Sequence, residues 1–207
     1  MPARLGVLIS GRGSNLRAII DAIAEGRLAA EIALVISNMP GAPGLAHAAR
    51  AGLPARVLPH RDWPARDAYD RALADTLQQH GVDLVCLAGF MRVLGPAFLA
   101  AFPHRVLNIH PSLLPAFPGV EAQRRAFEHG VKITGATVHL VTAELDAGPI
   151  VMQSAVEVRD DDTVETLAAR ILVEEHRLYP AAIQRVLEGR WRLDGRRFVG
   201  LANNGDR

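Results

Sequence analysis

The most informative segment of the chain is Val106-Leu107-Asn108-Ile109-His110-Pro111-Ser112-Leu113-Leu114-Pro115. Side chains alternate between the two faces of a strand, so Asn108 and His110 are expected on the same face. Pro111 disfavours helical geometry at His110 and ends the hydrogen-bond ladder of the strand. The stretch therefore predicts an amide and an imidazole side by side at the C-terminal end of a strand, where open α/β sheets bind their ligands.

Around this strand, short aliphatic and β-branched runs alternate with longer helical patterns, which indicates βαβ units. The predicted strands are 5–10, 32–37, 55–58, 84–88, 106–110, 133–141 and 150–158. The predicted helices are 15–25, 44–51, 65–80, 96–101, 121–129 and 163–187. Asp194-Gly195 predicts a hairpin with a type I′ turn. The expected fold class is α/β: a twisted, mostly parallel sheet of about seven strands with helices on both faces, a Rossmann-like N-terminal half and an antiparallel strand toward the C-terminal half.

The composition is that of a globular chain, with 207 residues, 49% hydrophobic and 22% charged. Its length allows one large domain or two small ones. Because no internal repeat, low-complexity segment or linker is evident, we expect a single domain over 1–207, with a phosphate-binding half (1–100) and a catalytic half (101–207). A net charge of +1 gives no global field for nucleic acid or an acidic membrane. The only cysteine, Cys86, lies in an apolar run and is expected as a buried thiol in a reducing compartment. No apolar segment approaches the ~20 residues of a membrane span, so we expect a cytoplasmic protein.

A glycine loop, Gly11-Arg12-Gly13-Ser14-Asn15-Leu16, follows the first predicted strand and leads into a helix. Free backbone N–H groups and the helix dipole make such a loop an anion site. Position 16 lacks the third glycine of a dinucleotide fingerprint, Ile36-Ser37-Asn38 carries no acidic residue for a ribose, and no Gly-Lys-Ser/Thr follows. The loop therefore favours a single phosphate monoester over NAD or ATP. The alternative is a tight turn with Ser14 or Asn15 as helix cap.

The candidate catalytic group consists of Asn108, His110 and Asp146. Each has an ordinary structural alternative: an asparagine that binds loop amides, a histidine in a polar core contact, and an aspartate in a turn. Together, an amide donor, an imidazole and a carboxylate that raises the imidazole pKa suit acyl transfer to an amine without a covalent intermediate. Ser112 is not expected to act as a nucleophile. The histidines lack metal-ligand spacing, so no metal site is predicted, and His139 is expected to support the site.

The last predicted helix is preceded by a candidate capping box, Asp162 with Glu165, and is expected to end at Gly189. Glu175 falls on its apolar stripe, where a carboxylate needs a partner. The arginines at 190, 192, 196 and 197 are interpreted as a solvated edge.

Five ordered motifs make the chain resemble the phosphoribosylglycinamide formyltransferase family over nearly its whole length. They are 10–16, 87–94, 108–115, 135–139 and 142–149. The resemblance implies transfer of a formyl group from 10-formyltetrahydrofolate to the amine of glycinamide ribonucleotide in de novo purine biosynthesis. It implies catalysis by Asn108, His110 and Asp146, with the imidazole held protonated by the carboxylate.

Binding roles are also implied by the resemblance. The ribonucleotide would contact Gly13, Ser14, Asn15 and Glu175. The folate would contact Arg66, Met91, Arg92, Val93, Leu94, Thr142, Ala143, Glu144, Leu145 and Asp146, with Arg66 near its glutamate tail. The expected partners are these two small molecules alone, with no metal, nucleic acid or membrane, and the expected state is a monomer or homodimer.

The chain departs from some relatives at Glu121, Gln123 and Leu172, and Arg12 adds a guanidinium beside the phosphate loop. Three rival functions are open. A formyltetrahydrofolate hydrolase would use the same three groups with water as acceptor. A methionyl-tRNA formyltransferase would need a basic C-terminal domain. A phosphate-ligand sensor would explain the glycine loop but not the catalytic group.

Overall fold

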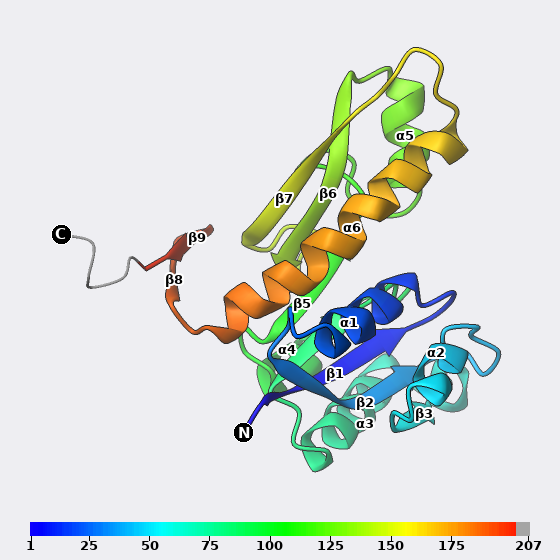
Figure 1. The fold of residues 1–207 in the computed structure, drawn as a ribbon. Helices are drawn as coiled ribbons and strands as arrows, with labels where there is room; N and C mark the ends of the chain where they lie inside the picture. Colours follow the sequence, from blue (N-terminus) through cyan, green and yellow to red (C-terminus); the bar gives the residue numbers. More distant parts are fainter. Residues whose placement is uncertain (202–207) are drawn as a thin grey trace.

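The computed structural model describes residues 1–201, and the fold is a nine-stranded sheet with helices against both faces (Figure 1). The strand order is β3-β2-β1-β4-β5-β6-β7-β9-β8. The strands are β1 (Ala3–Ile9), β2 (Ala30–Ser37), β3 (Ala55–Val57), β4 (Leu84–Leu87), β5 (Val106–His110), β6 (Ile133–Leu140), β7 (Ile150–Glu157), β8 (Trp191–Asp194) and β9 (Arg197–Gly200). All seven predicted strands are confirmed, and the predicted hairpin adds its two strands to the same sheet.

Six α-helices and one 3₁₀ turn are described within residues 1–201. They are α1 (Ser14–Ala24), α2 (Leu45–Arg50), η1 (His60–Asp62), α3 (Arg66–Gln79), α4 (Pro96–Ala101), α5 (Ala122–His129) and α6 (Val164–Leu187). One hydrophobic cluster joins α1 and α6 to the sheet, and a second joins α3 and α4 to it. Because both faces are covered, β1, β2 and β4 are almost continuously apolar.

Residues 106–110 form β5, with the bounds that were predicted. The neighbouring strand on one side, β4, runs parallel to β5, and the one on the other side, β6, runs antiparallel. Strands β1, β4 and β5 run parallel, so their carboxyl ends meet at one edge of the sheet. On the other side, β6 runs antiparallel and brings His139 opposite Asn108 and Thr137 opposite His110. The sheet therefore changes from parallel to antiparallel at the strand that carries the candidate catalytic pair.

Helix α6 crosses this part of the sheet and is fixed to it by Tyr179. The fully buried phenol donates to the backbone oxygens of Leu87 in β4 (3.0 Å) and Leu107 in β5 (3.1 Å). Beside it Cys86 is completely buried, and burial raises the pKa of its thiol. The prediction of an inert buried thiol is therefore confirmed.

Two local predictions are wrong. The capping box of α6 is formed by Thr163 and Thr166, whose side chains and backbone N–H groups bond reciprocally. The Asp162 carboxylate is instead engaged by Arg170, so the next residue caps the helix.

The hairpin turn also differs from its prediction. Asp194 pairs with Arg197, so the loop residues are Gly195 and Arg196 rather than Asp194-Gly195. Only Gly195 has a positive φ, of 57°, whereas a type I′ turn needs positive φ at both loop residues.

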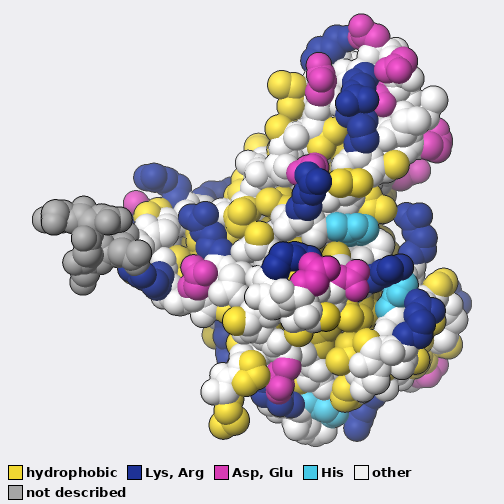
Figure 2. All heavy atoms as spheres, in the orientation of Figure 1, with side chains coloured by type: hydrophobic (Ala, Val, Ile, Leu, Met, Phe, Trp, Pro, Cys, Tyr) yellow, Lys and Arg dark blue, Asp and Glu magenta, His cyan; other side chains and the backbone are white. Residues whose placement is uncertain are grey.

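Charged side chains of both signs are mixed over the face shown in Figure 2, in keeping with the net charge of +1. Within residues 1–201, no helix has the length and apolar character needed to cross a membrane.

Candidate active site

The structure brings the three predicted catalytic side chains together at the C-terminal end of β5. His110 Nδ1 lies 3.4 Å from Asp146 Oδ2, and both side chains are buried. Asn108 stands two residues earlier on the same strand and is half-buried. His139, on the neighbouring strand β6, lies 3.6 Å from the other Asp146 oxygen through its Nε2. One carboxylate is therefore shared by two imidazoles.

The hydrogen bonds of His139 indicate its tautomer. Its Nδ1 lies 3.0 Å from the backbone oxygen of Leu140, which can only accept, so Nδ1 carries the proton. In the neutral ring Nε2 then accepts from the Asn108 amide, 3.2 Å away. His139 thus orients Asn108, as expected of a residue that supports the candidate site.

His110 is fixed on its other side by the 111–119 segment. Its Nε2 lies 2.9 Å from the backbone oxygen of Phe117 and must donate to it. In the neutral ring this leaves Nδ1, the nitrogen that faces Asp146, as the site that takes up a proton. The pair is therefore arranged so that a proton gained by His110 lies against a carboxylate.

Burial works against the expectation that Asp146 holds His110 protonated. Burial lowers the pKa of His110 below its usual 6.5, and this outweighs the Phe117 carbonyl and the Asp146 carboxylate, which both raise it. Burial also acts to raise the pKa of Asp146, but its close contact with His139 and the hydrogen bond from the Gly119 N–H hold it below its usual 3.8. At neutral pH both shifts favour a neutral imidazole beside an ionised carboxylate.

The turn that presents Asp146 is tightly constrained. Asp146 has a positive φ of 49°, a region that aspartate tolerates better than most residues. Its Oδ2 accepts the Gly119 N–H at 2.7 Å. At Gly148 a Cβ would lie 1.8 Å from the backbone oxygen of Leu140, so only glycine fits there. Both constraints fix where the carboxylate points.

The glycine loop has the predicted form at the start of α1. Gly13 has a φ of 70°, and a Cβ there would lie 2.6 Å from the Cα of Gly44. Asn15, in the first turn, donates through Nδ2 to Glu175 Oε2 of α6 at 2.7 Å. Burial raises the pKa of Glu175, against the opposing effects of Asn15 and Arg12. The partner that the Glu175 carboxylate needed is thus a residue of the glycine loop.

The glycine loop adjoins the 89–95 segment, which contains four of the residues predicted to bind folate. Ser10 N donates to the backbone oxygen of Gly89 at 3.1 Å, and Met91 N donates to the Ser10 hydroxyl at 2.8 Å. The predicted phosphate site and the predicted folate segment therefore lie side by side.

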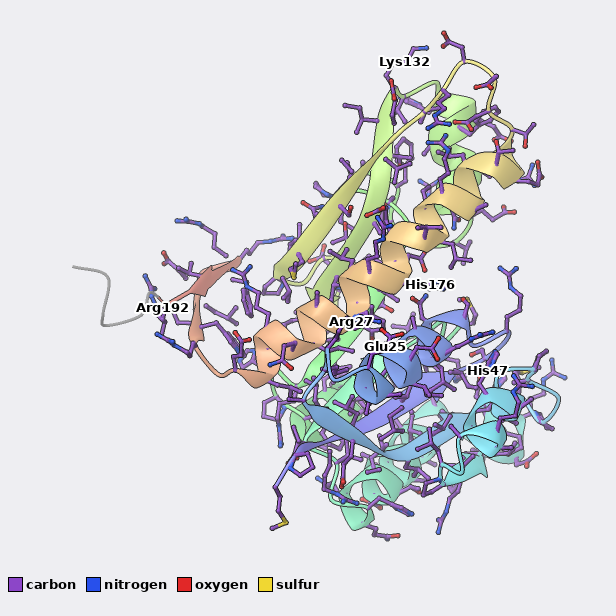
Figure 3. All side chains as sticks on the ribbon, viewed as in Figure 1. Glu25, Arg27, His47, Lys132, His176 and Arg192 are labelled. Carbon is purple, nitrogen blue, oxygen red and sulfur yellow. The ribbon has the colours of Figure 1, made fainter. Side chains whose placement is uncertain are left out.

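His47 also approaches the glycine loop, although no sequence motif includes it. Its Cδ2 lies 3.5 Å from the place of a Cβ on Gly13, and Arg50 contacts its Nδ1 at 2.7 Å. Figure 3 labels His47 on α2, on the opposite side of α1 from Arg192 of the hairpin. Only the packing of α2 against the loop reveals it.

The predicted folate residues form two segments with uncovered apolar side chains. Met91 is 71% exposed, Val93 46% and Leu145 54%, unusual values for such residues. Leu94 is buried in the core and anchors the 91–94 segment to it. Thr142, Ala143, Glu144 and Arg66 are exposed, and Arg92 is half-buried. Exposed apolar groups on both segments suit a flat, largely apolar ligand.

A cleft of about 640 Å³ lies beside the Asp146 turn, between that turn and the C-terminal hairpin. Arg196 of the hairpin donates to the backbone oxygen of Ala147 at 2.6 Å. All four arginines are exposed, as the interpretation of a solvated edge requires. Arg196 also contacts the turn, because β9 pairs with β7 and brings the hairpin tip close to it. Among residues 1–201 no group of three or more metal-ligating side chains was found.

Comparison with known proteins gives a consistent result. The formyl transferase family model matches residues 3–183. A crystal structure of glycinamide ribonucleotide transformylase 1 from Symbiobacterium toebii superposes with a TM-score of 0.95 at 57% identity, covering 97% of this chain and 95% of that one. Phosphoribosylglycinamide formyltransferase of Escherichia coli (strain K12) is 43% identical over 199 residues, 93% of this chain and 94% of that protein.

The trifunctional purine biosynthetic protein adenosine-3 of Gallus gallus is 48% identical over 186 residues, which is 90% of this chain but 18% of that protein. The chain thus spans about a fifth of such curated relatives. These matches show that the chain belongs to the formyl transferase family. Within the family it falls among the phosphoribosylglycinamide formyltransferases.

Proposed function

We propose that this protein transfers the formyl group of 10-formyltetrahydrofolate directly to the amine of glycinamide ribonucleotide, with Asn108, His110 and Asp146 as the catalytic residues. The observation that carries the proposal is the His110–Asp146 contact of 3.4 Å, with Asn108 on the same strand beside it. Membership in the family supports the overall reaction. The contacts among these three residues support the proposed proton transfer and oxyanion stabilisation.

In the proposed reaction the amine nitrogen attacks the formyl carbon, and the carbonyl electron pair moves to oxygen. The Asn108 amide donates to this oxyanion, since a neutral donor stabilises the charge as it develops. The amide is already oriented by His139, at 3.2 Å. No bond to the protein forms, so the tetrahedral intermediate joins the two substrates only.

We assign His110 the role of proton carrier, because the reaction moves one proton from the amine to the folate. The attacking amine must lose a proton, and the folate N10 must gain one before its bond to carbon breaks. A neutral His110 takes the first proton at Nδ1, directly or through water, and returns it to N10. Asp146 stabilises the imidazolium in between, because its carboxylate lies 3.4 Å from that nitrogen. A neutral resting imidazole is therefore the form that this cycle needs.

Substrate placement is the second contribution. We assign the phosphate of the ribonucleotide to Gly13, Ser14 and Asn15, with Glu175 holding the loop from α6, because free N–H groups at a helix start bind anions. We assign the pteridine to the segments 91–94 and 142–146, whose exposed apolar side chains suit it. Holding amine and formyl carbon together is worth ~7–11 kcal/mol of barrier, so these residues matter as much as the proton carrier.

The rest of the proposal concerns cofactors and assembly. The residues described offer no three-ligand metal group, and the proposed chemistry needs none. We propose that the enzyme is cytoplasmic and acts on small molecules. We also propose that it is a monomer or a homodimer, and analytical ultracentrifugation distinguishes these two states.

A two-substrate assay tests the function. Purified protein is incubated with 10-formyltetrahydrofolate, with and without glycinamide ribonucleotide, and tetrahydrofolate release is measured. Release only with the ribonucleotide supports the transferase. Release without it supports the hydrolase, and no release in either case supports a phosphate-ligand sensor.

A further inference from the structure

Asp70 of α3 is a buried carboxylate that the proposed chemistry does not use. It is 1% exposed, and burial raises its pKa despite the Gly95 N–H and two arginines that oppose the shift. A buried ionisable group of this kind destabilises a fold unless it has compensating contacts or a function. Its surroundings indicate a function.

The first contact of Asp70 is with the segment predicted to bind folate. Gly95 N donates to Asp70 Oδ2 at 2.7 Å, and a Cβ on Gly95 would lie at the same distance from that oxygen. The carboxylate therefore fits against the backbone at the end of the 91–95 segment. At the other end, Met91 N is held by Ser10.

The second contact is with two guanidinium groups. Arg66 Nε lies 3.7 Å from Asp70 Oδ2, one helical turn away on α3. Arg92 also acts electrostatically on Asp70 and lies over the ring of Tyr69, with its guanidinium carbon 5.2 Å from the centroid. One buried negative charge thus faces two arginines from different segments.

Two donors beside this charge have no partner among the described residues. They are the buried Nε of Arg92 and the hydroxyl of Tyr69, a residue that is 1% exposed. Buried donors in proteins are almost always paired, so an unpaired guanidinium N–H next to a second arginine indicates an acceptor other than the residues described here, 1–201. A carboxylate matches a guanidinium best.

We propose that Asp70 is a positioning residue for the formyl donor, and that its carboxylate fixes the 91–95 segment and orients Arg66 and Arg92 toward the glutamate carboxylates of the folate. This inference rests on the proposed function and deepens it, because it assigns specificity for the anionic tail to a residue that does not touch the tail. Asp70 also balances the two positive charges while no donor is bound.

The test compares two donors on wild type and Asp70→Asn. One donor is 10-formyltetrahydrofolate, and the other is the same molecule with both glutamate carboxylates converted to amides. Asparagine still accepts the Gly95 N–H, so the segment stays anchored and only the charge is lost. We expect KM for the acidic donor to rise about tenfold, the loss of one oriented charge-assisted contact, with kcat and the KM of the diamide within about twofold of wild type.

The matched control is Asp67→Asn, which removes one exposed charge from the first turn of α3 and should leave both KM values unchanged. If Asp70→Asn does not fold, Asp70→Ser keeps a small acceptor for Gly95 and serves instead. An equal KM rise for both donors, or no rise for either, overturns the proposal. A wild-type enzyme that transfers from neither donor refutes the proposed function instead, and one with equal KM for both refutes the carboxylate subsite.

Discussion

Asn15 and Glu175 are 160 positions apart in sequence and are joined by a buried hydrogen bond of 2.7 Å. The bond joins the first turn of α1, at the glycine loop, to the middle of α6. Glu175 is 7% exposed, so the fold keeps a carboxylate there at a cost in stability. The stability cost of burying Glu175, together with its hydrogen bond to the glycine loop, indicates that Glu175 belongs to a binding site rather than to the core.

Replacement of Glu175 should therefore separate stability from binding. Its folded pKa is raised above the usual 4.5, so its ionisation disfavours folding at pH above the raised pKa, and this penalty disappears as the pH falls toward 4.5. Glu175→Gln should raise Tm at pH 7–8 but not near pH 4, as scanning calorimetry can show. The KM for the ribonucleotide should rise about tenfold. A lower Tm at neutral pH would contradict this account.

The pH dependence of kcat/KM tests the resting state of His110. Because burial lowers its pKa below 6.5, and the cycle needs a neutral imidazole, kcat/KM should rise through a pKa below 6.5 and then stay level. Asp146→Asn removes a carboxylate that raises this pKa, so the acidic limb should move to lower pH. A limb that stays in place would belong to the substrate amine, and a fall in rate above that pKa would show that His110 must start protonated.

Asn108→Ala should reduce kcat by about 10²–10³, the usual cost of losing one oxyanion donor. The variant should fold normally, because the amide is half-buried and its described partner is His139. Circular dichroism and ligand-free Tm serve as controls. A kcat within a few fold of wild type would exclude Asn108 from the reaction.

Tyr179→Phe tests how α6 is held on the sheet. Loss of the hydroxyl leaves the Leu87 and Leu107 carbonyls without this donor, so the free energy of unfolding should fall by about 1–2 kcal/mol in urea titration. Tyr69→Phe is the matched control. Its hydroxyl is buried without a partner among the described residues, so its removal should be neutral or stabilising.

Arg196→Ala tests the contact between the hairpin and the Asp146 turn. Its guanidinium donates to the Ala147 carbonyl, so its loss should loosen the turn and raise KM for the folate by about threefold, roughly 0.65 kcal/mol. Arg192→Ala, on the same hairpin but exposed and near Asp194, should leave KM unchanged. Equal effects from both would indicate a general charge effect instead.

Local sequence patterns were sufficient to predict the strands of the sheet and the positions of Asn108 and His110. Alternation and Pro111 place Asn108 and His110 correctly on β5, because both effects act within a few residues. The capping box was misplaced because 162–165 and 163–166 both fit the spacing, and only the ion pair of Asp162 with Arg170 decides between them. Which residue caps a helix therefore depends on tertiary contacts, and these cannot be inferred from the spacing of residues in the sequence.

Three features of the site could not be predicted from the sequence for the same reason. The pKa of His110 depends on how deeply the 111–119 segment buries it. The approach of His47 to Gly13 depends on the packing of α2. The role of Asp70 depends on a backbone N–H 25 residues away. Each follows from tertiary packing rather than from local propensity.

The central claim is that Asp146 makes His110 an effective proton carrier for direct formyl transfer. The most direct measurement is the single-turnover rate of formyl transfer by Asp146→Asn, with both substrates saturating and the fold verified by circular dichroism. We predict a rate about 10²–10³ below wild type, since the imidazolium loses its counter-charge. A rate close to wild type would contradict the account.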